Sequence, residues 1–241
     1  MGRHPGGACG TMPRVSLDEL EAAVTHCRLC PRLVAWREEV ARVKRASFAG
    51  EEYWARPIPG FGDPAARVVV FGLAPAAHGA NRTGRVFTGD RSGDFLFASL
   101  HRTGFANQPT SVARDDGLRL DDLWVTAAVR CAPPANKPLP AERDTCITTW
   151  AVPELAALER ARVVVCLGAF AWDAALRVRA AMPGGEPFPR PRPRFGHGAE
   201  LPGRPWTLLG CFHPSQQNTF TGVLTAPMMD AVFARARELA T

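Results

Sequence analysis

Long apolar runs are missing from this 241-residue sequence, and none approaches the roughly 18 residues that a membrane-spanning helix needs. The first residues, MGRHPGGACGTMPRVS, also lack the apolar centre of a secretory signal peptide. We therefore expect a cytoplasmic protein without membrane contacts, whose thiols stay reduced. With 46% hydrophobic residues, the natural expectation is a single α/β domain with one sizeable core.

Lysine is almost absent, since only Lys44 and Lys137 occur among 29 basic residues. The formal net charge is nevertheless +6, which favours a polyanionic partner such as nucleic acid. A GC-rich genome gives the same arginine bias without any function, so the charge alone leaves the partner open.

The two common phosphate-binding signatures, G-x-G-x-x-G and G-x-x-x-x-G-K-S/T, are missing as well, and there is no internal repeat. Their absence argues against a nucleotide-phosphate-binding α/β enzyme. That class stays an alternative, because a glycine-rich loop before a helix can hold a phosphate without either signature.

Four short runs rich in β-branched and apolar residues stand out, at 66–75, 122–131, 162–168 and 206–214. Three of them are nearly continuous apolar runs, as expected for strands buried on both faces of a parallel sheet. Helical patterns follow at 92–104, 140–161, 168–182 and 224–240, with Ser92 as the expected N-cap of the first and a break near Pro153 in the second. Another helical region, at 16–43, is interrupted at Pro31. This order predicts a three-layer α/β/α sandwich around a mainly parallel sheet.

Two segments look peripheral to the predicted domain, which we place at residues 16–241. Residues 1–15 are expected to be disordered, as chain ends often are. Residues 182–205 are rich in proline, glycine and arginine and are expected to form an extended excursion over the surface. Whether this excursion contacts a phosphate backbone stays open.

Three polar loops follow the predicted strands and are the candidate site. They are GLAPAAHGANRTGRVFTGDRSG at 72–93, RCAPPANKP at 130–138 and HPSQQNTFTG at 213–222. Ligands of open α/β folds bind beyond the carboxyl ends of the strands, so we expect the three loops to converge there.

Seven cysteines divide by position. Cys166 and Cys211 lie within apolar strands and are expected to be core residues, and Cys9 lies in the N-terminal tail. The remaining four are candidate metal ligands: Cys27 and Cys30 in CRLC, with Cys131 and Cys146. Four thiolates suit tetrahedral zinc or an iron–sulfur cluster, and the spacing does not choose between them. A chance CxxC beside two buried thiols is the other reading, and a redox dithiol is disfavoured because the CxxC does not follow a strand.

The three loop motifs together resemble those of the type-B (family 5) uracil-DNA glycosylases. The similarity runs from about Leu17 to the C-terminus and includes the four cysteines. It implies a three-layer fold with a four-stranded parallel sheet, and a [4Fe–4S] cluster in place of zinc. It also implies a monofunctional DNA repair hydrolase that removes uracil and some other deaminated bases, leaving an abasic site. A non-catalytic binder of damaged DNA with a structural metal is a further alternative.

A glycosylase must flip its target nucleotide out of the stack into a pocket. The resemblance assigns the pocket to Gly72, Leu73, Ala74, Phe87 and Asn136, of which Phe87 is the platform under the base and Asn136 can pair with a base edge. Phe87 could instead be ordinary core, and Asn136 a turn residue after two prolines.

Cleavage leaves negative charge on the base and positive charge on the sugar. His213 is placed to stabilise the base oxygen, in either protonation state. Asp90 would hold the attacking water and stabilise an oxocarbenium-like sugar. Related four-cysteine enzymes often carry an acid directly after the first glycine, where this chain has Leu73, and Asp94 is the rival acid, although it suits the first turn of a helix.

The segment 215–224 is expected to press on the minor groove of double-stranded, uracil-containing DNA. Asn218 would contact the base or its orphaned partner, and the DNA-binding candidates are Ser215, Gln217, Thr221 and Val223. A basic residue is expected at position 223 in this family, and valine there favours an apolar wedge instead. We expect the protein to act as a monomer.

Overall fold

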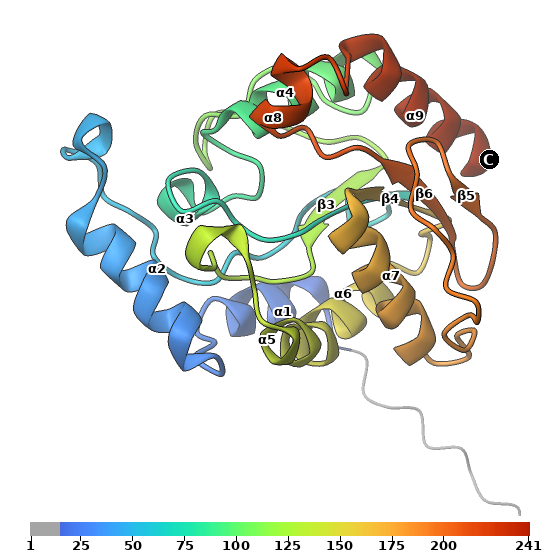
Figure 1. Cartoon of the computed structure of the whole chain (residues 1–241), viewed down its shortest axis with the longest axis horizontal. Coiled ribbons are helices and arrows are strands. Elements are labelled where there is room, and N and C mark those ends of the chain that lie inside the picture. The colour runs from blue at the N-terminus through green and yellow to red at the C-terminus, as the bar shows by residue number, and fades with distance from the viewer. Residues whose placement is uncertain (1–14) are drawn as a thin grey trace, which may run out of the picture.

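The computed structural model describes residues 15–241, so all of the segment 1–15 that was predicted to be disordered, except Val15, lies outside the described part. A six-stranded sheet forms the middle layer, in the order β1-β3-β2-β4-β6-β5 (Figure 1). The strands are β1 Phe61–Gly62, β2 Val68–Gly72, β3 Leu123–Ala127, β4 Val163–Leu167, β5 Glu200–Leu201 and β6 Thr207–Cys211.

The four central strands, β3, β2, β4 and β6, are parallel, and the short edge strands β1 and β5 pair antiparallel to β3 and β6. The predicted α/β class is therefore confirmed. The predicted four-stranded sheet was incomplete, because two-residue edge strands leave no periodic pattern in a sequence.

Helices cover both faces of the sheet. One face carries α4 Arg91–Arg102 and α9 Ala226–Leu239. The opposite face carries α6 Val152–Ala157 and α7 Ala169–Ala181. The remaining helical elements are α1 Leu17–Val24, α2 Pro31–Val43, α3 Ala80–Thr83, α5 Pro140–Cys146, α8 Gln216–Phe220, the short turns η1 Ala46–Phe48 and η2 Pro134–Asn136, and the π-turn η3 Ile147–Ala151. Within residues 15–241, no helix is both long and apolar enough to cross a membrane.

Successive side chains of each buried strand point to opposite faces of the sheet, so each strand contributes to both halves of the core. Val68 and Val70 of β2 pack with α4 and α9, whereas Val69 and Phe71 pack with α6 and α7. All five residues of β2, β3 and β4 are buried, as expected for central strands covered on both faces. The sheet is therefore a rigid base from whose carboxyl edge the loops project.

Two helix boundaries differ from the sequence-based expectation. The N-cap of α4 is Asp90, whose side chain accepts the Gly93 N–H, and not Ser92. Pro153 does not break its helix, because the π-turn η3 joins α5 to α6 and Pro153 lies in the first turn of α6, where no N–H is needed.

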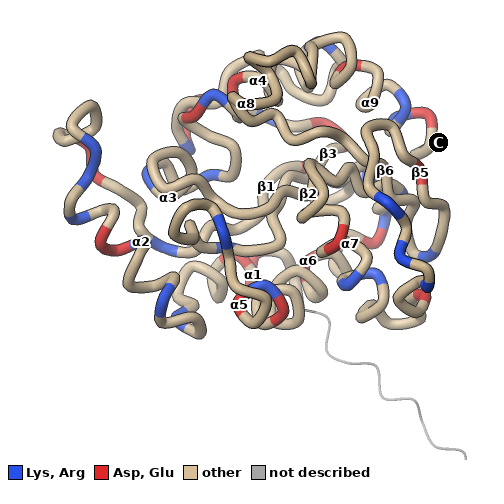
Figure 2. The backbone as a smooth tube through the Cα atoms, viewed as in Figure 1, with Lys and Arg blue, Asp and Glu red and all other residues tan. Residues whose placement is uncertain are grey.

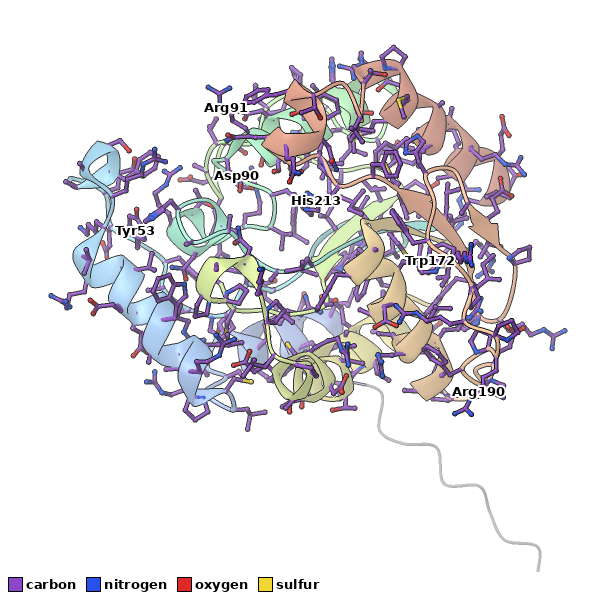
Figure 3. The ribbon with its side chains drawn as sticks, viewed as in Figure 1. Tyr53, Asp90, Arg91, Trp172, Arg190 and His213 are labelled. Atoms are coloured by element: carbon purple, nitrogen blue, oxygen red, sulfur yellow. The ribbon has the colours of Figure 1, made fainter. Side chains whose placement is uncertain are left out.

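The predicted excursion 182–205 connects α7 to β6 and includes β5. It is fixed at Trp172 of α7, whose ring contacts Phe195 edge-on at 6.2 Å and whose indole N–H donates to the Pro193 carbonyl. Arg192 also pairs with Asp173 of α7 at 2.8 Å. Figure 3 labels Trp172 and Arg190 on the side of the molecule away from Asp90. This connection thus packs along α7 and, through Phe195 and His197, also against Phe212, which directly precedes the loop 213–222.

Candidate active site

The loops after β2 and β3 leave the sheet side by side. The N–H groups of Ala128 and Val129 donate to the carbonyls of Gly72 and Leu73, each at 3.0 Å. The loop after β6 joins them from the other side, where the Gly168 N–H donates to the Cys211 carbonyl at 2.8 Å. The three loops therefore converge at the carboxyl edge of the sheet, as expected (Figure 1).

The first loop, residues 72–93, folds back tightly on itself. A Cβ at Gly72 would lie 2.9 Å from the Phe87 ring, and one at Gly79 would overlap the Asp90 carboxylate. A Cβ at Gly93 would overlap the Phe87 carbonyl, and Phe87 itself has a φ of +52°. Glycine is therefore required at three points to bring Phe87 and Asp90 into one place.

Asp90 is held within this fold. Its Oδ1 accepts the Gly93 N–H at 2.9 Å, and its Oδ2 faces Gly79. Burial raises the pKa of the Asp90 carboxyl, while the N–H groups of Gly93 and Ser92 and the nearby Arg82 oppose that rise. Asp94, the rival acid, lies exposed in the first turn of α4. Geometry thus favours Asp90 as the site carboxylate.

The His213 ring lies beside the Phe87 ring. The two ring centroids are 6.0 Å apart, at 40°. Gly168, at a φ of +92°, leaves room for the His213 Cβ, since its own Cβ would lie only 3.3 Å away. Burial lowers the pKa of His213 to about 4, so the imidazole is neutral at neutral pH. Figure 3 shows Asp90 and His213 on the same side of the sheet.

The turn after His213 is held by its own side chains. The Asn218 amide donates to the His213 carbonyl at 2.8 Å, and the Ser215 hydroxyl caps α8 by accepting the Asn218 N–H at 3.4 Å. The Thr221 hydroxyl donates to the Gln217 carbonyl at 2.5 Å. One amide N–H of Asn218 therefore holds the turn that carries His213, and the contact of Asn218 with a base stays a prediction.

Several predicted contact residues lie outward. Asn136 is exposed at the tip of η2, in a left-handed conformation, and Val223 is 47% exposed. Sequence reasoning missed Phe220, which is 67% exposed at the end of α8 with the Arg91 guanidinium 5.3 Å from its ring centroid. Phe220 is the single aromatic residue within 213–222, and that position in a polar segment was the available signal.

Charge does not mark the site. Figure 2 shows basic and acidic residues interspersed along the backbone, without a single basic face in this view. Many arginines are also paired, as in Arg67 with Asp122 and Arg102 with Asp230, both at 2.7 Å. The net charge of +6 is thus a weak guide to where a polyanion would lie.

The four candidate metal ligands line one pocket together with Leu33 and Trp150; they are Cys27, Cys30, Cys131 and Cys146. Three N–H groups donate to their sulfurs. The Trp150 indole reaches Cys27 at 3.3 Å, the Arg130 backbone reaches Cys146 at 3.3 Å, and Arg37 reaches Cys131 at 2.9 Å. Hydrogen bonds of this kind stabilise ligating sulfur and tune the metal it holds.

Burial raises the pKa of Cys131 to about 11 and that of Cys146 to about 12, and it also raises the pKa of Cys30. Without a bound cation these thiols are therefore protonated at neutral pH. Within residues 15–241, no three cysteine, histidine or acidic side chains gather closely enough to hold a single metal ion. The pocket is thus lined by thiols that are not arranged as a closed one-ion site.

An aromatic ring, a partly buried carboxylate and a neutral imidazole lie together at the carboxyl edge of a parallel sheet, where open α/β folds bind their ligands. The relatives identify the family. A model of the uracil DNA glycosylase superfamily matches residues 59–237, and the chain belongs to that superfamily.

Three curated relatives carry the name type-5 uracil-DNA glycosylase. The protein of Mycobacterium tuberculosis is 55% identical over 228 residues, which are 93% of this chain and 82% of the relative. That of Thermus thermophilus is 53% identical over 90% of this chain and 95% of the relative. That of Pyrobaculum aerophilum is 42% identical over 93% of each chain. The family resemblance seen in the three loop motifs is confirmed.

The buried His213 should make stability depend on pH. Its native pKa of about 4 lies below the ordinary 6.5, so between these values the unfolded chain binds a proton that the native state does not. The contribution of His213 to the free energy of unfolding is complete above pH 6.5. It falls by up to about 3 kcal/mol as the pH drops to 4. Urea unfolding of wild type and His213→Gln across this range measures the effect.

The variant should show a flatter decline than wild type, whereas His101→Gln, which replaces an exposed imidazole in α4, should follow wild type. Parallel curves for wild type and His213→Gln would mean that the His213 imidazole is not desolvated.

Proposed function

We propose that this chain removes uracil, and some other deaminated bases, from DNA by hydrolysing the N-glycosidic bond and leaving an abasic site. The observation that carries the proposal is that the loop 72–93 holds the partly buried Asp90 against Gly79 and Gly93 next to Phe87, whose ring centroid lies 6.0 Å from that of neutral His213. The names of the relatives support the choice of uracil and DNA. A nucleotide-phosphate enzyme has no comparable support, and a non-catalytic binder would have no use for a partly buried carboxylate and imidazole.

Phe87 would lie under the flipped base. The close approach of its ring to Gly72 fixes the ring plane, and the backbone of Gly72, Leu73 and Ala74 would line the pocket wall. A neutral His213 can donate one N–H to the base oxygen that becomes negative as the bond breaks. Asn218 keeps that imidazole in place through the His213 carbonyl.

Asp90 would act at the other end of the breaking bond. Its Oδ1 is engaged by the start of α4, so Oδ2, beside Gly79, is the oxygen that would orient water and face the cationic sugar. The N–H groups at the helix start and Arg82 favour the charged form of the carboxyl against the effect of burial.

Asp90→Asn should slow single-turnover base release by roughly 100-fold or more, because it removes the charge that favours the sugar cation. Asparagine caps helices as well as aspartate does, so stability should change little. Asp94→Asn is the matched control and should release base at nearly the wild-type rate. The assay is alkali-labile cleavage of a uracil-containing duplex.

If Asp94→Asn abolishes release while Asp90→Asn does not, the assignment of the acid is wrong but the glycosylase proposal stands. If wild type releases no base from this duplex, the proposed function itself fails.

The exposed end of α8 would face the duplex. Phe220, with Val223 and Arg91 beside it, can enter the space that the flipped nucleotide vacates, and Gln217 and Thr221 would contact the neighbouring backbone. Ser215 is engaged as the cap of α8, so its part would be to shape the turn. Asn136, exposed on the opposite loop, would close on a base edge.

Phe220→Ala should lower base release from duplex DNA by roughly tenfold, since stacking by one aromatic side chain is worth about 1–3 kcal/mol. Release from single-stranded DNA should change much less, because no partner strand has to be unstacked there. Val112→Ala, which shortens an exposed apolar side chain elsewhere, is the control. An equal loss on both substrates would place Phe220 in the base pocket and not in the wedge.

We also propose that the four thiols hold a [4Fe–4S] cluster. A cluster puts its own iron and sulfide atoms between the thiolates, so it needs a pocket lined by cysteines and not direct sulfur contacts. Cys27, Cys30, Cys131 and Cys146 line such a pocket, and three N–H groups point at their sulfurs. When bound, the cluster would cross-link the segment before α2, the loop after β3 and the end of α5. Zinc is the runner-up.

The purified protein should be brown and contain about four irons per chain. Loading should release protons, because burial keeps Cys131 and Cys146 protonated in the empty pocket. Cys27→Ala should lose iron, whereas Cys211→Ala, in strand β6, should keep it. Colourless protein with one zinc per chain would overturn the cluster.

The proposed setting follows from the substrate. A repair enzyme acts where DNA is, so we place it in the cytoplasm, acting as a monomer on double-stranded DNA. We treat residues 16–241 as one glycosylase domain, since both halves of the core share one sheet. The excursion 182–205 packs along α7 and is not assigned to DNA.

A further inference from the structure

Arg37 is a buried cation that points at the cysteine pocket. It lies on α2 and is only 2% exposed. Its Nη1 donates to the Cys131 sulfur at 2.9 Å and its Nη2 to the Cys27 carbonyl at 3.2 Å. Its Nε is buried without a hydrogen-bond partner. Both of its side-chain hydrogen bonds therefore go to cysteines of the proposed centre.

Arg37 differs from the other buried arginines within residues 15–241. Arg85 pairs with Asp116 at 2.7 Å, Arg130 with Glu154 at 2.5 Å, and Arg179 with Glu186 at 3.7 Å.

In that same range no carboxylate lies within ion-pair distance of the Arg37 guanidinium. Glu38, its neighbour in the helix, instead binds Arg28 at 2.6 Å. A buried guanidinium without an anion is costly, so the pocket should supply negative charge.

We propose that Arg37 is the internal counter-ion of the four-cysteine centre. The inference depends on the proposed metal centre of four cysteines, and it does not depend on the proposed removal of bases from DNA. Four thiolates around a [4Fe–4S] core carry a net negative charge, and Arg37 would offset part of it from inside the protein. The planar fork of arginine suits this place, because one nitrogen reaches sulfur while the other reaches the Cys27 carbonyl.

The same residue contacts the proposed active-site loop through its backbone. The Arg37 carbonyl accepts the Asn81 side-chain amide at 3.2 Å, and Asn81 is a buried residue of α3 within the loop 72–93. A side-chain substitution at position 37 leaves this carbonyl in place. The charge of Arg37 can therefore be tested apart from its backbone contact with the loop.

The test compares Arg37→Met, which removes the charge at similar length, with Arg37→Lys, which keeps it. Arg42→Met is the control, because Arg42 lies exposed on the same helix and pairs with Glu39. The readouts are iron per chain, the reduction potential by voltammetry, and the rate at which ferricyanide bleaches the visible absorbance.

Arg37→Met should lower the reduction potential and bleach several-fold faster, since less positive charge favours the more oxidised cluster. Arg37→Lys should lie nearer to wild type, and Arg42→Met should match it. A potential and bleaching rate equal to wild type in Arg37→Met would overturn the counter-ion role. Should that variant fail to fold, Arg37→Gln against Arg37→Lys gives the same comparison of charge.

None of these readouts uses DNA, so their outcome is separate from that of base release. If the pocket holds zinc, chelator challenge replaces voltammetry, and Arg37→Met should lose zinc faster than Arg42→Met. Wild-type protein that binds neither iron nor zinc would leave Arg37 without an anion and overturn the proposal.

Discussion

The site depends on one steric constraint: the loop 72–93 crosses itself with no room for a side chain at three crossings. Gly72 lies against the Phe87 ring, Gly79 against the Asp90 carboxylate and Gly93 against the Phe87 carbonyl. Because each contact is between parts of one loop anchored on β2, the ring and the carboxylate are set relative to each other before any ligand binds. Such preorganisation is what a pocket that must stabilise a short-lived charge requires.

Burial acts on the two ionisable groups of this pocket in opposite senses. It lowers the pKa of His213 to about 4, which keeps the imidazole neutral, and nothing nearby opposes it. It raises the pKa of Asp90, but there the N–H groups of α4 and Arg82 act against it. Desolvation thus favours the neutral donor at His213, whereas a charged Asp90 depends on the N–H groups and Arg82 that act against desolvation.

The features that could be predicted from the sequence are those that a local residue pattern controls. Continuous apolar runs located the four central strands, and glycine-rich and His-Pro motifs located the loops. The edge strands β1 and β5 were missed because two residues carry no period. Serine and aspartate are equally good N-caps, so local sequence could not decide between Ser92 and Asp90. The close contact between Gly79 and Asp90, which only the tertiary fold creates, favours Asp90. The exposure of Phe220, and the absence within residues 15–241 of a carboxylate that pairs with Arg37, also depend on the tertiary structure.

The cysteine pocket and the loop 72–93 share their supports, which explains why motifs far apart in the chain occur together. Ala74, in the first loop, packs on the cluster formed by Leu33, Val129, Cys131 and Cys146. Val129 also donates to the Leu73 carbonyl, and Asn81 is held by the Arg37 carbonyl. Any movement of the thiols would therefore reach the loop that carries Phe87 and Asp90 through packed or hydrogen-bonded neighbours. A centre that takes no part in the chemistry can still decide how well the reacting groups are held, since small displacements of preorganised groups are costly in rate.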